Sequence, residues 1–158
     1  MTDQVAMHAV REKLAECAMH EKRMLTAAAQ LSSRFPLTAD VFAHLDDIES
    51  SFVDQMVYRF SKLQDTLGEK IFSGILKLAQ EDVKGKTFLD ILHRMEELDL
   101  VKADSWLALR ELRNEIAHEY AGDDEKTVLA LNSVYTRLDE LAGIYRRAAA
   151  FIADRFGV

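Results

Sequence analysis

Apolar residues recur along most of this chain at the period of an α-helix, and no stretch alternates as a β-strand does. The longest run spans residues 42–78 with about 3.6 residues per apolar step, the α-helical value. Its apolar positions are Phe42, Leu45, Ile48, Phe52, Met56, Phe60, Leu63, Leu67, Ile71, Ile75 and Leu78. We therefore expect one long helix here, with Thr38 as its N-cap and Gly68 and Gly74 as kink positions.

Helix breakers and capping residues set the other boundaries. A first helix is expected over residues 3–31 and ends before Pro36, which a helix interior does not tolerate. Its apolar positions are Leu14, Ala18, Leu25, Ala28 and Leu31. After a polar loop at 81–86, Thr87 and Asp90 form a capping-box pattern for a short helix over residues 88–98.

Two further helices complete the chain. Asp104 or Ser105 is the expected N-cap of a helix over residues 106–120, which Ala121-Gly122 ends. Asp123 then starts the last helix. Its apolar positions are Val128, Leu131, Tyr135, Leu138, Ala142, Tyr145, Ala149, Ile152 and Phe156. Their spacing of about 3.5 residues is typical of antiparallel bundle seams.

These elements predict an all-α, up-and-down bundle of four or five helices that forms one domain over residues 1–158. Long helices with wide apolar faces leave surface for a partner, so we expect a homodimer. No run of about 18 apolar residues is present, so no membrane span is expected. The chain begins without an apolar signal core, and the expected location is the cytoplasm.

Composition excludes several classes of function. The net charge is −7, which disfavours a bulk, nonspecific nucleic-acid binder. The single cysteine, Cys17, excludes an internal disulfide and is expected to be a buried small hydrophobe. Gly85-Lys86-Thr87 lacks the preceding glycine of a P-loop, because position 80 is Gln80. Histidines are scattered singly, so we expect neither a metal nor a cofactor.

One group of polar residues stands out near the end of the fourth expected helix, at Arg113, Asn114 and His118. Asn114 and His118 are four residues apart and share a helix face, which Glu111 joins. Arg113 and His118 are about 140° apart on an ideal helix. Their side chains therefore converge through the length of the arginine, or across a two-fold axis from separate subunits.

These residue types are sufficient for metal-free RNA cleavage. An imidazole exchanges protons near neutral pH, and a guanidinium holds a phosphate and stabilises its developing charge. Asn114 would orient the imidazole or a ribose hydroxyl. A structural explanation is also open: His118 would favour a helix C-terminus through the dipole, and Arg113 would pair with a nearby carboxylate.

The segment Arg113-Asn114-Glu115-Ile116-Ala117-His118-Glu119-Tyr120 resembles the Arg-x4-His-x-Tyr motif of HEPN-domain proteins, particularly their HepT-like branch. The resemblance covers about residues 38–156 and implies a helical bundle that dimerises around a shared cleft. It implies a metal-independent ribonuclease toxin with Arg113 and His118 as the catalytic pair. Asn114, Asp54 and Arg59 would then be supporting polar groups.

The resemblance also implies a partner, a nucleotidyltransferase antitoxin of the MNT type. In some such pairs the antitoxin transfers AMP onto the motif tyrosine, here Tyr120, and this silences the nuclease. AMP adds bulk and negative charge where RNA phosphate must bind. Tyr120 has a structural explanation as well, because its ring could pack on the apolar stripe with its hydroxyl at the rim.

Charge around the motif argues against a strong nuclease. Residues 84–120 hold six basic and eight acidic side chains, which predicts weak and salt-sensitive RNA binding. Two main hypotheses stay open: a ribonuclease toxin, or a non-catalytic module that binds a nucleotidyltransferase or a nucleotide through the same cleft. A free-standing helical protein with a degenerate motif is a third.

Overall fold

The computed structural model describes residues 3–117 and 123–158, and this part of the chain folds into helices and loops without a strand. The elements are α1 (Gln4–Gln30), α2 (Ala39–Ala43), α3 (Asp47–Thr66), the π-helical turn η1 (Leu67–Ile71), α4 (Phe72–Leu78), α5 (Phe88–Glu97), α6 (Ala103–Ala117) and α7 (Asp124–Phe156). The predicted all-α helical bundle is confirmed.

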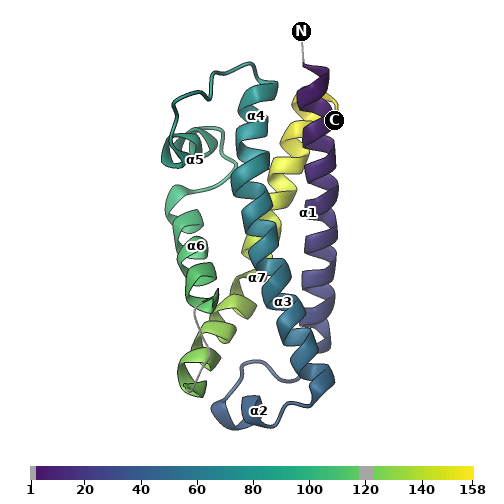
Figure 1. Ribbon diagram of the computed structural model, residues 1–158, viewed down its shortest axis with the longest axis vertical. Helices are drawn as coiled ribbons and strands as arrows, with labels where there is room; N and C mark the ends of the chain where they lie inside the picture. Colours follow the sequence, from purple (N-terminus) through teal and green to yellow (C-terminus); the bar gives the residue numbers. More distant parts are fainter. Residues whose placement is uncertain (1–2, 118–122) are drawn as a thin grey trace.

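The long helices run up and down the long axis of the molecule (Figure 1). α1 descends, α3 and α4 ascend beside it, α6 descends on the other side and α7 ascends behind them. α5 lies beside α4, and α2 closes the opposite end. None of the described helices combines the length and the apolar character that crossing a membrane requires.

The single helix predicted from Thr38 to residue 78 is wrong at its beginning. Thr38 does cap a helix, since its hydroxyl accepts a hydrogen bond from the Val41 amide, but that helix is the short α2. Asp46 caps α3 through a full capping box, in which Asp46 and Glu49 each accept the other's main-chain N–H. This box starts a new helix that the continuous apolar stripe concealed.

The two expected kink positions behave differently. Gly68 lies in η1, where one wider turn joins α3 to α4, whereas Gly74 lies inside the regular helix α4. A Cβ at Gly68 would lie 3.0 Å from the Trp106 ring, and one at Gly74 would lie 2.8 Å from a methyl group of Val10. Both glycines therefore allow another helix to approach closely.

The buried face of α1 differs from the predicted one. Ala18 is exposed and Leu14 and Leu25 are half-buried, whereas Ala28 and Leu31 are buried as expected. The buried positions of α1 and its cap are Val10, Cys17, His20, Met24, Ala27, Ala28 and Leu31. The buried face of α1 is therefore turned by roughly 60° from the predicted one, which is less than the 100° of one residue. Cys17 is buried as predicted, and this burial raises the pKa of its thiol to about 12.

Most of the remaining boundaries agree with the sequence. Thr87 and Asp90 form the predicted capping box of α5, and Asp123 caps α7. The prediction for α6 is wrong at its start, because α6 begins at Ala103, whose amide donates to the Glu96 carboxylate of α5 at 2.9 Å. The expected end at Ala121-Gly122 lies outside the described residues.

Candidate functional site

Arg113 projects from α6 to α3 and forms a two-pronged ion pair with Asp65. Its Nε donates to Oδ1 at 3.2 Å and its Nη2 donates to Oδ2 at 2.8 Å. The two side chains are 30% and 31% exposed, so the pair sits at the surface without being fully solvated. Hydrogen bonding to Asp65 raises the pKa of Arg113 above its ordinary value, and the guanidinium stays charged.

The packing of α6 on α3 fixes the position of this pair. The buried side chain of Gln64 donates to the main-chain carbonyl of Leu109 at 2.9 Å, one turn before Arg113. Further along the same contact, Trp106 is 1% exposed and meets Phe72 edge to face at 4.8 Å between ring centres. α6 is thus held on α3 by a buried hydrogen bond and on α4 by aromatic packing, and Asp65 and Arg113 face each other at the rim of this contact.

The two parallel hydrogen bonds to Asp65 orient the guanidinium plane of Arg113 and use only its Nε and Nη2 atoms. Nη1 of Arg113 has no hydrogen bond to any other residue in the described ranges 3–117 and 123–158. An arginine so held offers a preorganised N–H edge to a phosphate oxygen. Asp65 offsets much of the positive charge, so this arginine alone would attract a phosphate weakly.

The other sequence-predicted residues are distributed over several places. Asn114 is exposed on α6, and Asp54 is exposed on α3. Asp54 lies eleven residues before Asp65, about 16 Å along the helix, so it is not beside the ion pair. His118 and Tyr120 lie outside the described residues. The structure therefore brings Arg113 together with Asp65 and leaves Asn114 and Asp54 apart from them.

Arg59 belongs to a second polar cluster, between α3 and α1. Its Nη1 lies 2.9 Å from Nδ1 of His20, which is 7% exposed. Because a guanidinium only donates, Nδ1 accepts and the imidazole is neutral. Burial lowers the pKa of His20, and the charge of Arg59 lowers it further.

A groove of about 540 Å³ connects the two clusters along α3. Its walls come from α1, α3 and η1, and Asp65 joins it to Arg113. The lining residues are Glu16, Met19, His20, Tyr58, Arg59, Lys62, Asp65, Thr66, Glu69 and Lys70. Arg59 and the Arg113–Asp65 pair are therefore parts of one surface, six residues apart on α3 or about 9 Å.

Sequence reasoning missed Asp65 and His20. Asp65 had no local signal, because residues 64–66 fall between two consecutive apolar positions, Leu63 and Leu67, and its partner Arg113 is 48 residues away. His20 had no signal, because its partner is 39 residues away.

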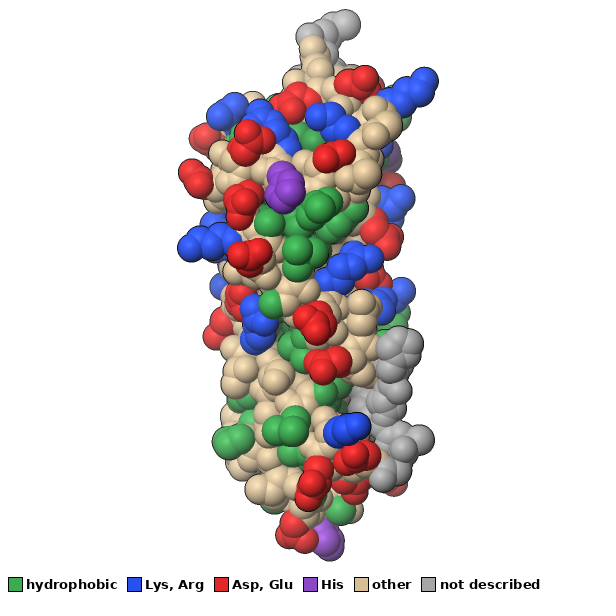
Figure 2. Space-filling model, turned by 90° about the vertical axis from the view of Figure 1, so that its left-hand side faces the viewer, with side chains coloured by type: hydrophobic (Ala, Val, Ile, Leu, Met, Phe, Trp, Pro, Cys, Tyr) green, Lys and Arg blue, Asp and Glu red, His purple; other side chains and the backbone are tan. Residues whose placement is uncertain are grey.

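The face made by α5 and α6 has a different charge arrangement. Acidic and basic side chains are interspersed on it, with apolar ones between them (Figure 2). Arg94 shows the pattern, because it donates to both carboxylate oxygens of Glu81 at 3.0 Å. On this face the positive and negative side chains therefore offset one another.

The chain was compared with protein-family models, with curated proteins and with solved structures, and no match was found.

Proposed function

We propose that this protein is a metal-independent ribonuclease in which Arg113 and His118 act on one phosphodiester. The observation that carries the proposal is the Arg113 guanidinium, which Asp65 orients with two hydrogen bonds while 30% of its side chain stays exposed. The Arg-x4-His-x-Tyr resemblance to HEPN domains supplies His118 as its counterpart.

The proposed reaction is an internal transesterification of RNA. His118 accepts the proton of a 2′-hydroxyl, and the 2′-oxygen forms a new bond to the adjacent phosphorus. The bond from phosphorus to the 5′-oxygen breaks, and that oxygen takes up a proton from solvent as it leaves. The products are a 2′,3′-cyclic phosphate and a 5′-hydroxyl end. Arg113 stabilises the negative charge that develops on the non-bridging oxygens.

Asp65 is a positioning residue in this proposal. Asp65 acts on the substrate only through Arg113, because it holds the plane of the Arg113 guanidinium and keeps that group charged. The same carboxylate repels phosphate, so productive binding needs cations elsewhere on the surface.

The test is a cleavage assay with a matched arginine control. Purified protein is incubated with end-labelled RNA in EDTA, and the product ends are identified. We expect Arg113→Ala and His118→Ala to lose at least about 100-fold in rate. Arg110→Ala removes an arginine of the same helix that lies over the Phe88 ring at 5.4 Å, and it should cleave like wild type. Equal rates in all four proteins contradict the proposal.

A second candidate is a non-catalytic module that binds a nucleotidyltransferase or a nucleotide. The observation that favours it is again the Arg113–Asp65 pair, because an arginine neutralised within its own chain can be purely structural. This candidate predicts a stable complex and no RNA loss. The cleavage assay separates the two, since both functions allow a nucleotidyltransferase partner.

Regulation follows from the same resemblance. We propose that the protein is a homodimeric toxin whose MNT-type nucleotidyltransferase antitoxin transfers AMP from ATP to the Tyr120 hydroxyl. The tyrosine oxygen bonds to the α-phosphorus of ATP, pyrophosphate leaves, and the hydroxyl proton is released. Co-expression with such an antitoxin should add the mass of one AMP group and stop cleavage. Tyr120→Phe should abolish the added mass, whereas Tyr58→Phe, at a 50% exposed tyrosine of α3, should retain it. Retention of the modification in Tyr120→Phe contradicts this assignment.

A further inference from the structure

Five basic side chains line neighbouring positions of α1, α3 and η1 and form no ion pair with a described carboxylate. We call them the α1–α3 basic groove; its members are Lys22, Arg23, Arg59, Lys62 and Lys70. The charges of Arg59, Lys62 and Arg23 all act on His20 and lower its pKa, after the larger effect of burial. Cations from both helices therefore gather around one point.

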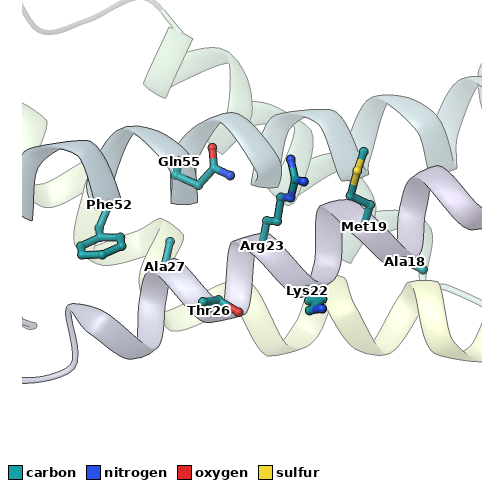
Figure 3. Close-up of a pocket in the computed structure, with 8 residues that line it drawn as sticks. All are labelled: Ala18, Met19, Lys22, Arg23, Thr26, Ala27, Phe52 and Gln55. Carbon is teal, nitrogen blue, oxygen red and sulfur yellow. The ribbon is translucent and has the colours of Figure 1, made fainter. Parts of the chain in front are cut away.

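The groove consists of two hollows that meet at Met19, which lines both. One is the hollow beside Asp65. The other, of about 610 Å³, lies further along α1 and α3 (Figure 3). Met19 and Arg23 reach from α1 toward α3, and Phe52 and Gln55 contribute from α3. Together the hollows follow the line between the two helices and end near the Arg113–Asp65 pair.

Most of the acids in the groove are already paired. Glu16 accepts from Lys13 at 2.9 Å, and Asp65 accepts from Arg113. Glu69 is the acid that lines the groove without a described ion pair. The groove is thus a local positive surface on a protein whose net charge is −7. It contrasts with the compensated face of α5 and α6 (Figure 2).

Exposed ring and sulfur surfaces lie between the cations. Tyr58 is 50% exposed and Met19 is 40% exposed, while Phe52 is half-buried in the floor. Arg59 and Lys62 lie 5.2 and 5.7 Å from the centre of the Tyr58 ring. A stackable ring flanked by cations suits a nucleobase joined to its phosphates, which is the pattern of single-stranded nucleic-acid sites.

We propose that the α1–α3 basic groove binds the backbone of single-stranded RNA and directs it toward Arg113. The proposal deepens and rests on the ribonuclease function, which names RNA as the substrate. It resolves the weakness of Arg113 as a phosphate ligand, because the groove supplies cations that Asp65 does not neutralise. Single strands are favoured over acidic peptides because of the exposed, cation-flanked Tyr58.

The test measures binding without cleavage. A fluorescein-labelled single-stranded RNA with 2′-O-methyl groups cannot be cleaved by 2′-hydroxyl attack, so its fluorescence anisotropy reports binding alone. Arg23→Gln/Lys62→Gln is compared with Lys77→Gln/Lys126→Gln, which removes two exposed cations from α4 and α7. Thermal melts verify that both variants fold.

We expect the groove variant to bind at least about 10-fold more weakly, and the control less than about 2-fold, at equal salt. The dependence of log affinity on log salt should become shallower by about 1.4 in the groove variant, about 0.7 for each lost phosphate contact. Tyr58→Ala should weaken binding further, since stacking on one aromatic ring is lost.

Three outcomes contradict the proposal that the groove binds RNA. They are no RNA binding by wild type at low salt, equal losses of RNA affinity in the two double variants, or displacement of the labelled RNA by a polyglutamate peptide as effectively as by an RNA of the same charge. Unmodified RNA separates this proposal from the ribonuclease. Binding that depends on the groove, without cleavage, contradicts the ribonuclease proposal and supports the RNA-binding groove. Cleavage that Arg23→Gln/Lys62→Gln leaves unchanged contradicts the RNA-binding groove and supports the ribonuclease proposal.

Discussion

Arg113 combines a structural contact with the chemical role that we propose for it. Its pairing with Asp65 joins α6 to α3, and in the proposed reaction the same pairing would orient the guanidinium toward a phosphate. The sequence allowed both roles, a catalytic arginine and one paired with a carboxylate. The carboxylate could not be named from sequence, because Asp65 is 48 residues away and belongs to no motif.

The Arg113–Asp65 contact should be measurable as a coupling energy. Arg113→Ala, Asp65→Ala and the double variant form a cycle, with unfolding followed in urea. We expect a coupling of about 1 kcal/mol, because the pair has two parallel hydrogen bonds but is roughly one-third exposed. Arg137 and Glu140, a two-pronged pair within α7, provide a comparison cycle. A coupling of zero would show that the contact does not hold α6 on α3.

His20 predicts a pH dependence of stability. Its folded-state pKa is lowered by burial and by Arg59, so below pH about 6.5 the unfolded chain binds more protons than the folded one. Stability is therefore full above that pH and decreases as the pH falls through it. His20→Gln keeps an acceptor for Arg59 and removes the titration. Its urea midpoint should fall less between pH 7.5 and 5.5 than that of wild type.

The exposed His93→Gln is the control for removing one imidazole. If His20→Gln and His93→Gln both follow the wild-type curve, His20 does not contribute to the acid sensitivity of the fold.

Among the helices, the sequence predicted the capping residues better than it predicted which face of each helix is buried. The Thr87–Asp90 box and the Asp123 cap appear where the sequence predicts them, because a cap depends on residues three or four positions apart. The Asp46–Glu49 box was equally local, but the apolar stripe running through it concealed the break. The buried face of α1 could not be fixed from spacing, because Ala18 and Cys17 are both small, and which of them is buried depends on how α1 packs on α3, α4 and α7.

η1 gives the element-scale prediction. Gly68→Ala would place a Cβ 3.0 Å from the Trp106 ring, which is 1% exposed and has little room to move. We expect a loss of about 1–3 kcal/mol in urea unfolding, as for an overpacked core. Gly143→Ala, in the middle of α7, meets only the flexible end of Arg147 at 3.4 Å and should be neutral or stabilising. The same sign for both variants would mean that the close Gly68–Trp106 approach does not matter.

At the scale of the whole molecule, the bundle segregates its charge. The protein is acidic overall, yet the five cations of the α1–α3 basic groove form no ion pair with a described carboxylate, while those of the α5–α6 face are interspersed with acids (Figure 2). The charge count over residues 84–120 did not include this groove. Its cations Lys22, Arg23, Arg59 and Lys62 lie earlier in the chain, and folding brings them together. The helical class followed from periodicity, whereas this surface depends on which helices become neighbours.

The final prediction concerns the proposed homodimer and the origin of the two catalytic groups. Arg113 is directed at α3 of its own chain, and residues five apart on an ideal helix point about 140° apart. We therefore expect Arg113 of one subunit to act with His118 of the partner subunit. Mixing inactive Arg113→Ala and His118→Ala chains under exchange conditions then restores about a quarter of wild-type cleavage, since half the dimers are mixed and each has one intact site of two. An intrachain site restores none, because every site in the mixture lacks one group.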